Sequence, residues 1–303
     1  MTKQFKKEYK LQAGEDTVLL LEGGAMRGIF TAGVLDAFME KGLYFPRMIA
    51  ISVGTLLGVC YMTGQKERIL RVNIKFVKDR RYMGLHHLLR DGSYFNFRFM
   101  FGDIAHTLEP FDYEGFAEAK EEIFAIATAC RNGRPVYFSN KDYDIDTFMK
   151  ICEASCSIPL FSKPVKLKEE SYVDGGVGMP LCPLPCEIPF PHEKLIYILT
   201  RDVSYRKKPV PRAFRSMMRA IYGRKFPAVA EEICTVPERY NERMEQLSKL
   251  EKEGRVFIIR PMKPTEVPWT ESNPHKLMRL YGEGYHLGMK HFEELMRWLH
   301  GEN

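Results

Sequence analysis

The order of local patterns in the first 62 residues constrains the fold more than any other feature of this sequence. Residues 17–21 (TVLLL) form a short apolar run typical of a buried strand, and a glycine-rich turn and a helical pattern follow it. The same order returns at residues 47–62, where RMIAI precedes a turn at Ser52 and an apolar helical segment. Two consecutive strand–turn–helix units predict an α/β fold with a mainly parallel sheet and helices on its faces.

The rest of the chain extends this pattern and changes in character near residue 200. The expected strands are 123–129, 135–138, 165–167, 171–173, 195–199 and 255–259, and the expected helices are 29–39, 55–62, 145–155, a segment within 207–225, 231–250 and 277–299. The aromatic-rich residues 80–111 predict the loops and short helices of a lid or cap. We therefore expect an α/β domain over residues 17–200 and a mostly helical extension over residues 201–303.

Composition places the chain among globular proteins with a packed core. Of its 303 residues, 45% are hydrophobic and 28% are charged. No run reaches the roughly 18–20 apolar residues that span a bilayer, and residues 1–15 lack the apolar segment of a secretory signal. Seven cysteines, an odd number, make a poor disulfide framework. These features together predict a cytoplasmic location.

The cysteine spacing and the net charge leave alternatives open. Cys152/Cys156 and Cys182/Cys186 have a spacing seen in structural zinc sites, although ordinary free thiols are the simpler interpretation. The net charge of +6 either favours an anionic membrane surface or has no specific meaning. Nucleic-acid binding needs basic residues gathered in a recognisable module, and we find none, so we expect no nucleic-acid partner.

Ser52 lies where the second predicted strand meets its helix. The sequence of residues 50–54, AISVG, has the setting of a nucleophile elbow, a sharp turn that lifts a serine hydroxyl above the sheet edge. The N-terminus of the next helix favours negative charge beside that hydroxyl. The usual pattern is G-x-S-x-G, and Ala50 adds one methyl group. The alternative is a serine that only caps the helix.

The turn after the first strand, residues 22–28 (EGGAMRG), suits an oxyanion hole. Backbone N–H groups in a glycine turn reach a developing oxyanion without obstruction by side chains. Dinucleotide binding is the rival interpretation, but its G-x-G-x-x-G fingerprint requires glycine at position 25, where the chain has Ala25. Arg27 either neutralises an anionic head group or bridges loop carbonyls, and we favour the second role.

Asp174 is the candidate base for the serine. It ends the predicted strand 171–173, and Gly175 and Gly176 allow a tight turn that projects its carboxylate toward a neighbouring strand end. Such a carboxylate accepts the serine proton only if its pKa rises or if a short hydrogen bond forms away from water. A plain Asp-Gly turn is the alternative interpretation.

A histidine base is a further alternative. Ser52, Asp174 and either His192 or His275 follow the Ser–acid–His order of α/β-hydrolases. His192 lies in a proline-rich loop, however, and no histidine of the chain follows a strand in a turn of small residues. We therefore favour an aspartate base.

In combination, the three motifs and their order resemble the patatin-like phospholipase family. The family's oxyanion motif, D-G-G-G-x-R-G, matches residues 22–28 with two substitutions. Its G-x-S-x-G elbow matches residues 50–54 with one substitution, and its Asp-Gly-Gly is intact at residues 174–176. Residues 154–161 also resemble the segment before the family's Asp strand. The resemblance covers about residues 17–200 and is closest to the bacterial branch with a helical C-terminal extension.

This resemblance implies a three-layer α/β/α fold and hydrolysis of a lipid ester, either a phospholipid or a lysophospholipid, without cofactor or metal. It implies a catalytic dyad in which Ser52 attacks the ester to form an acyl-enzyme and Asp174 is the base. The implied oxyanion hole consists of the backbone at Gly23, Gly24, Ala25 and Val53, and the supporting motif residues are Arg27, Gly28, Gly54, Gly175 and Gly176.

Two readings compete with a fully active enzyme acting on free substrate. In one, the substitutions at Ala25 and Ala50 leave a weak or inactive lipid-binding pseudoenzyme. In the other, residues 207–225 add peripheral contact with a membrane surface, because Phe214, Met217, Met218 and Ile221 share a helical face bordered by arginines. For that helix we favour a core-facing role with a solvated basic side.

Overall fold

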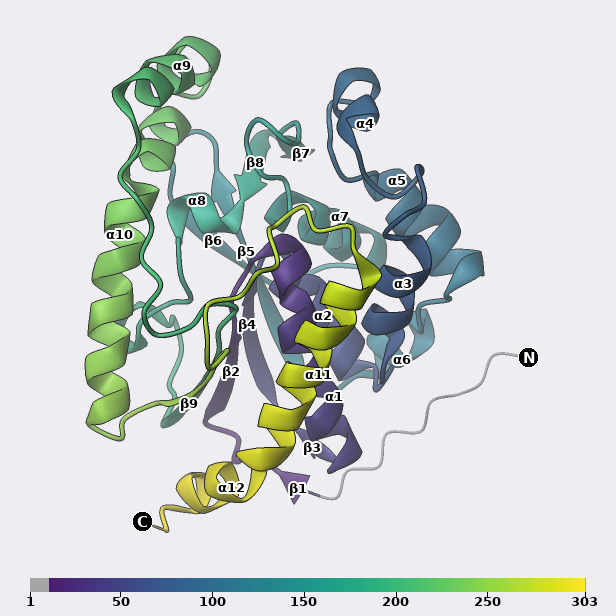
Figure 1. Ribbon diagram of the computed structural model, residues 1–303, viewed down its shortest axis with the longest axis vertical. Helices are drawn as coiled ribbons and strands as arrows, with labels where there is room; N and C mark the ends of the chain where they lie inside the picture. The colour runs from purple at the N-terminus through teal and green to yellow at the C-terminus, as the bar shows by residue number, and fades with distance from the viewer. Residues whose placement is uncertain (1–10, 303) are drawn as a thin grey trace.

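The structure, a computed structural model, describes residues 11–302 and has one large mixed sheet at its centre (Figure 1). Its strands are β2 (Thr17–Leu21), β4 (Arg47–Ile51), β5 (Glu122–Ala129), β6 (Pro135–Ser139), β7 (Val165–Leu167), β8 (Glu170–Asp174), β9 (Lys194–Ile198) and β10 (Phe257–Ile259). Five strands run parallel in the order β10-β9-β2-β4-β5. Beyond them β8 pairs antiparallel with β5, and β7 with β8; β6 also pairs with β5.

Helices cover both faces of this sheet (Figure 1). One face carries α1 (Ile29–Glu40), α2 (Val53–Met62), α3 (Arg68–Phe76), α7 (Ile145–Ser155) and α11 (Pro274–Lys290). The other face carries α8 (Gly175–Gly178) and the long α10 (Pro227–Lys252), against which α9 (Arg212–Tyr222) packs. The remaining elements are β1 (Leu11–Gln12) paired with β3 (Leu43–Tyr44), α4 (Leu85–Arg90), α5 (Phe97–Phe99), a π-helix (Met100–Leu108), α6 (Tyr113–Glu118), α12 (Phe292–His300) and 3₁₀ turns at Ala25–Gly28 and Pro185–Glu187.

The apolar strands explain the three layers. A strand buried on both faces is apolar throughout, with successive side chains pointing to opposite sides. In β2, Leu19 and Leu21 join the core beneath α1 and α2, whereas Val18 and Leu20 join the core beneath α10. The predicted α/β/α architecture with a mainly parallel sheet is therefore confirmed.

Most predicted elements are present, and a few features differ. The strand predicted at 171–173 is β8, which runs antiparallel to β5 within the mainly parallel sheet. The predicted helix 277–299 is two helices that meet at His291. Residues 68–76, for which no element was expected, form α3. The aromatic-rich segment 80–111 does contain short helices, together with the π-helix.

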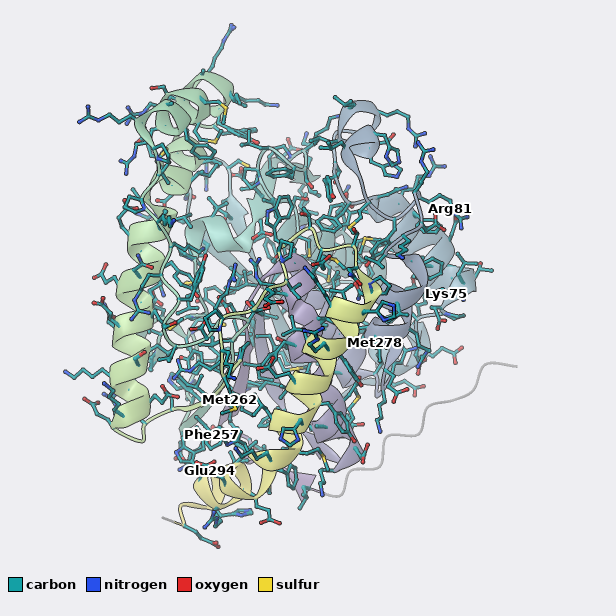
Figure 2. All side chains as sticks on the ribbon, viewed as in Figure 1. Lys75, Arg81, Phe257, Met262, Met278 and Glu294 are labelled. Carbon is teal, nitrogen blue, oxygen red and sulfur yellow. The ribbon has the colours of Figure 1, made fainter. Side chains whose placement is uncertain are left out.

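The segment after residue 200 is built into the same sheet and helix layer. It supplies β10, which pairs with β9 through Ile258 beside Tyr197. Figure 2 shows Phe257 of β10 beside α12, where its ring centroid lies 5.8 Å from that of Trp298. The predicted division of the chain at residue 200 stays a prediction.

Helices α1 and α11 approach through glycines. A side chain at Gly33 of α1 would overlap the Tyr281 carbonyl oxygen, and one at Gly284 of α11 would overlap the Phe30 carbonyl oxygen. Further along, a Cβ at Gly288 would lie 2.8 Å from the Ala37 methyl carbon. The two backbones therefore touch directly, which fixes α11 against the first helix of the fold.

Residues 11–302 form no helix whose length and apolar character would let it cross a bilayer. Most of the polar N-terminal stretch, on which the prediction about a secretory signal rests, lies outside the described residues.

Candidate active site

Ser52 occupies a strained turn between β4 and α2. Its backbone has φ 54° and ψ −130°, outside the regions that L-residues with side chains ordinarily adopt. Such strain persists only where the surroundings enforce it, and it is found disproportionately at functional sites. Here a Cβ at Gly54 would lie 2.6 Å from the Leu21 carbonyl oxygen, so the turn after Ser52 requires glycine. Ala50, by contrast, lies in the regular strand β4 with its methyl group buried.

Ser155, at the end of α7, holds this turn in place. Its hydroxyl accepts a hydrogen bond from the Ser52 N–H at 2.9 Å and donates one to the Ile126 carbonyl at 2.7 Å. The Thr55 hydroxyl lies 3.2 Å from the same oxygen. Ser155 is fully buried, so these contacts link α2, α7 and β5 beneath the serine. Nothing in the sequence pattern marked this residue individually.

Asp174 reaches the same level of the sheet from the opposite direction. Ile51 pairs with Ile126 of β5, and Asp174 pairs with Ala127, the next residue of that strand. The antiparallel direction of β8 therefore brings the end of that strand beside Ser52. Gly175 is required at this point, because a side chain there would overlap the Ile126 carbonyl oxygen.

The Asp174 carboxylate is buried and only half satisfied. Oδ1 accepts a hydrogen bond from the Gly176 N–H at 2.7 Å, whereas Oδ2 has no hydrogen-bond partner among the described residues. Burial raises the pKa of Asp174 to about 6, although interactions with the Ser52 hydroxyl and the Gly176 N–H oppose the shift. The site thus contains a carboxylate of raised basicity, one oxygen of which accepts no hydrogen bond from a described residue.

The Ser52 hydroxyl lies between this carboxylate and the Cys156 thiol. Its proximity lowers the pKa of each group, against the larger upward effect of burial. Its contact with Asp174 is looser than an ordinary hydrogen bond, since Oδ2 has no partner within that limit. Bonds between nucleophile and base are often long in free enzymes and shorten when substrate binds.

The glycine turn lies directly against the serine. A Cβ at Gly23 would lie 2.9 Å from the Ser52 Cβ, and one at Gly28 would lie 2.6 Å from a methyl carbon of Val53. Ala25, with φ 48°, adopts the left-handed conformation that favours glycine. Close packing therefore explains the glycines at 23 and 28, whereas Ala25 occupies a strained position.

Four backbone N–H groups at this junction are free to bind an oxyanion. The amides of Gly23, Gly24, Ala25 and Val53 have no hydrogen-bond acceptor among residues 11–302. Val53 is the first residue of α2, where an N–H has no partner within the helix. All three predicted motifs therefore meet at Ser52.

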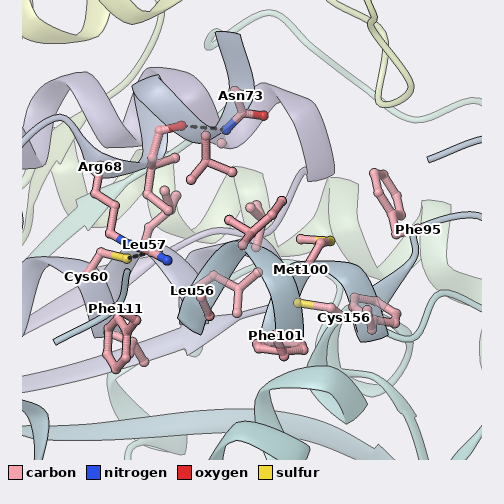
Figure 3. A pocket seen from close by; sticks show the side chains of 18 of the residues that line it. Leu56, Leu57, Cys60, Arg68, Asn73, Phe95, Met100, Phe101, Phe111 and Cys156 are labelled. Atoms are coloured by element: carbon pink, nitrogen blue, oxygen red, sulfur yellow. Dashed lines mark hydrogen bonds between the residues drawn. The ribbon is translucent and has the colours of Figure 1, made fainter. Parts of the chain in front are cut away.

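Two cavities open on either side of Ser52. The smaller, about 120 Å³, is mainly apolar and runs beneath α3 and the π-helix. Figure 3 shows Leu56, Met100 and Phe101 among its lining side chains. At its far side the buried Arg68 donates hydrogen bonds to the Glu109 and Pro110 carbonyls, so the charge of that residue is satisfied.

The larger cavity, about 490 Å³, contains both Ser52 and Asp174 and is more polar. The Glu22 carboxylate lies in it, held by the Thr200 N–H at 2.6 Å and the Thr200 hydroxyl at 3.0 Å. Arg27 also lines this cavity, and its side chain donates no hydrogen bond to a described residue. The loop-bridging role that we favoured for Arg27 therefore lacks the contacts it requires.

The alternatives from the sequence find little support in this geometry. None of the described histidines lines either cavity at Ser52, so neither His192 nor His275 is placed to act on it. His192 instead contacts the Phe190 carbonyl at 3.0 Å. All seven cysteines are free thiols, and residues 11–302 contain no cluster of metal-ligating side chains.

Comparison with known proteins assigns the family. Residues 19–184 match the patatin-like phospholipase family, and the chain belongs to it. Residues 226–300 match a second family, described as a domain of unknown function. The expectation from the sequence motifs is thereby confirmed at the level of the family.

The curated relatives are distant. The chain is 23% identical to the uncharacterized protein YjjU of Escherichia coli K12, over 81% of this chain and 68% of YjjU. It is 27% identical to the uncharacterized protein YqhO of Bacillus subtilis 168, over 52% of this chain and 62% of YqhO. It is 24% identical to the probable lipid hydrolase 463L of Invertebrate iridescent virus 6, over 52% of this chain and 59% of 463L.

The chain thus spans about three-fifths of the length of YqhO and 463L. Among solved structures, VipD from Legionella pneumophila aligns with 95% of this chain and 67% of its own, with a TM-score of 0.44 and 14% identity.

Proposed function

We propose that this protein hydrolyses carboxylic esters of lipids, with Ser52 as nucleophile and Asp174 as base. The observation that carries the proposal is the position of Ser52, in a strained turn between an apolar cavity and a polar one. A buried carboxylate of raised pKa lies beside the serine. Membership of the patatin-like phospholipase family supports the same reaction.

In the first half of the proposed reaction, Ser52 Oγ attacks the ester carbonyl carbon and its proton passes to the Asp174 carboxylate. The carbonyl oxygen becomes an oxyanion, which the backbone amides of Gly23, Gly24, Ala25 and Val53 stabilise in this proposal. The bond to the alcohol oxygen then breaks, and the alcohol leaves with the proton from Asp174. The acyl group remains on Ser52.

In the second half, Asp174 takes a proton from water as the water oxygen attacks the acyl carbonyl. The bond to Ser52 Oγ breaks, Ser52 regains a proton from Asp174, and the fatty acid leaves. The smaller cavity is apolar enough to hold an acyl chain, while the larger one is left for the alcohol part of the substrate. We propose a phospholipid or a lysophospholipid as that substrate.

The first test replaces each member of the dyad. We expect Ser52→Ala and Asp174→Asn to lower hydrolysis of a p-nitrophenyl ester at least about 10³-fold, because each removes a group that acts in the transition state. His192→Ala and His275→Ala are the controls and should keep wild-type rates. If Asp174→Asn kept full activity and one of the histidine variants lost it, the result would contradict the dyad and indicate a catalytic triad with a histidine base.

A lipid-binding pseudoenzyme is the second candidate, and two observations favour it. The contact of Ser52 with Asp174 is loose, and Ala25 holds a strained conformation. Labelling by a fluorophosphonate probe separates the two functions, since only an activated serine reacts with it. Wild-type protein that never labels, although it binds lipid as well as Ser52→Ala does, would establish the pseudoenzyme.

We also propose peripheral contact with a membrane surface at the end of the molecule that carries α4 and α9 (Figure 1). Apolar side chains are exposed on both helices, most strongly Leu89 at 88% and Ile221 at 52%. Basic residues of α9 border them, as interfacial helices require. We place this contact on the cytoplasmic side, in keeping with the seven free cysteines.

Apolar substitutions test this contact better than charge reversal does. Arg215 and Arg219 form ion pairs with Glu238 and Glu231 of α10, so reversing their charge would also disturb the packing of α9. We expect Leu89→Ser with Ile221→Ser to weaken binding to vesicles that contain phosphatidylglycerol. Met262→Ser is the matched control, because Met262 is 68% exposed but lies away from α9 (Figure 2). Unchanged vesicle binding by the double variant would remove the membrane proposal.

A further inference from the structure

Three basic side chains converge on the larger cavity beside Ser52. Arg27 comes from the glycine turn, Arg201 follows β9, and Lys207 lies in the loop before α9. Each is partly buried and lines the cavity. These residues are far apart in the sequence, so only the fold brings them together.

None of the three contacts a carboxylate directly in the part of the chain that the structure describes, although Glu22 acts on Arg27 and Lys207 at longer range. Among residues 11–302, none forms an ion pair and none donates a side-chain hydrogen bond, and the buried Nε of Arg27 has no acceptor. By contrast, Arg239 on the neighbouring α10 pairs with Glu232 at 2.7 Å. Cations withdrawn from water are normally paired, because an unpaired buried charge is costly. The cavity thus contains basic groups whose hydrogen-bonding capacity is unused.

The carboxylates in the cavity do not balance this charge. Glu22 accepts its hydrogen bonds from Thr200 rather than from a cation, and burial raises its pKa. Asp174 faces Ser52 and the Gly176 N–H. Burial, together with the charges of Arg27 and Arg201, lowers the pKa of Lys207 to about 8 even though the two carboxylates oppose this shift. The surroundings of Lys207 therefore favour the arrival of another anion.

We propose that this cavity binds the phosphate of an anionic lipid head group through Arg27, Arg201 and Lys207. The inference rests on the proposed function, because it places the acyl chain in the smaller cavity and the scissile ester at Ser52. Phosphate oxygens accept charge-assisted hydrogen bonds from several cations at once, and a guanidinium group can donate two in parallel. The proposal narrows the substrate to lipids whose head group carries net negative charge.

Two tyrosines of the cavity, Tyr205 and Tyr240, argue against a choline head group beside the three cations. A quaternary ammonium is held by the open faces of aromatic rings. Here Arg201 lies over the Tyr205 ring, 4.2 Å from its centroid, and Lys207 lies over the Tyr240 ring at 4.4 Å. Each of these two rings thus has one face covered by a cation, and the same cations would repel the ammonium. The site therefore discriminates against zwitterionic phosphatidylcholine.

A binding measurement on full-length Ser52→Ala tests the site without turnover. The probes are monomeric dihexanoyl phosphatidylglycerol, monomeric dihexanoyl phosphatidylcholine and inorganic phosphate, followed by calorimetry. We expect phosphatidylglycerol to bind at least about tenfold more tightly than either of the others, and Arg201→Gln or Lys207→Met to remove most of that difference. The neighbouring Lys208→Met is the matched control, because Lys208 is exposed and does not line the cavity.

Unfolding of the variants is not expected to explain a loss of binding. Removing a partly buried cation without an ion-pair partner should leave the protein at least as stable, and a thermal melt of each variant checks this. Equal affinity for the two lipids would overturn the proposal. Inorganic phosphate that binds as tightly as phosphatidylglycerol would assign the site to a free anion and overturn the head-group assignment.

Turnover of the same two lipids by the wild-type protein separates this inference from the proposed function. We expect kcat/KM to favour phosphatidylglycerol about tenfold, with the ratio near one in Lys207→Met and unchanged in Lys208→Met. Selective binding without any hydrolysis would refute the enzyme and support the anion site. Hydrolysis of both lipids at equal rates, with equal affinity, would refute the anion site and leave the enzyme.

Discussion

At the scale of single residues, the two alanines that replace motif glycines have opposite consequences. Ala25 has a positive φ, whereas Ala50 lies in a regular strand with its methyl group in the core. We expect Ala25→Gly to stabilise the protein by roughly 0.5–1 kcal/mol through relief of strain. We expect Ala50→Gly to destabilise it by about 1–2 kcal/mol through lost packing and added chain entropy. Urea unfolding measures both, and shifts of the same sign would contradict this account.

The raised pKa of Asp174 makes activity dependent on pH. The carboxylate must be ionised to accept the serine proton, and its pKa is about 6. Below that pH, kcat/KM should fall about tenfold for each pH unit, and it should level off above it. A profile of the free enzyme on a neutral ester measures this, and a midpoint near the ordinary aspartate value would show that burial does not raise the pKa.

The same shift has a consequence for stability, of the opposite sign to that of a salt-bridged carboxylate. The pKa of Asp174 in the folded protein lies above the unfolded value of 3.8, so the folded state is more stable with this carboxyl protonated than with it ionised. That contribution is present below the unfolded pKa and is lost as the pH rises through about 6. Asp174→Asn should therefore be more stable than wild type near pH 8, by up to about 3 kcal/mol, and lose this advantage near pH 4. Parallel thermal melts at the two pH values check it.

The sequence is enough to predict the candidate dyad but not the residues around it. Ser52 and Asp174 each lie in a short local motif at a strand end, and such motifs can be recognised in the sequence alone. Ser155 supports the site through a hydrogen bond with the Ser52 N–H, and the two residues are 103 positions apart in the sequence. Arg201 and Lys207 reach the cavity from loops without a pattern of their own. Contacts of this kind depend on tertiary packing, which one sequence does not display.

At the scale of elements, the glycine contact between α1 and α11 should be intolerant of any side chain. A methyl group at Gly284 would overlap the Phe30 carbonyl oxygen, whereas Gly282 has no atom within 4 Å of its Cβ position. We expect Gly284→Ala to destabilise the protein by about 2–3 kcal/mol. Gly282→Ala, in the same helix, should instead stabilise it by up to about 1 kcal/mol. Denaturant unfolding of this matched pair provides the measurement, and equal effects would show that the helices do not touch there.

Prediction of elements succeeds where the apolar pattern is local and fails where it is not. Strands β2 and β4 match the sequence prediction in both bounds, because each is a short apolar run closed by a turn. Helix α3 was missed although it has five apolar residues, because those at 72, 74 and 76 alternate as in a strand. The π-helix at residues 100–108 depends on the packing of its aromatic side chains around the apolar cavity.

At the scale of the whole molecule, the segment after residue 200 contributes a strand to the central sheet and a helix to the layer beside it. Its strand β10 pairs with β9, and its helix α11 packs along α1. Its Trp269 carbonyl accepts a hydrogen bond from the Met26 N–H at 3.3 Å. We expect a chain that ends at residue 200 to lack a cooperative thermal transition and to aggregate, because the buried faces of α1 and β9 would be exposed. A monomeric product that unfolds cooperatively would instead support an autonomous domain over residues 17–200.

The direct contact of α1 with α11 also bears on how such a chain can change over time. Because Gly33 and Gly284 leave no space between the two backbones, neither helix can be exchanged for one from a relative unless the incoming face has a small residue at the matching place. Recombination that replaced only the C-terminal segment would displace α1 and, with it, the glycine turn beside Ser52. The segment of unknown role and the hydrolase-like core are therefore expected to be inherited together.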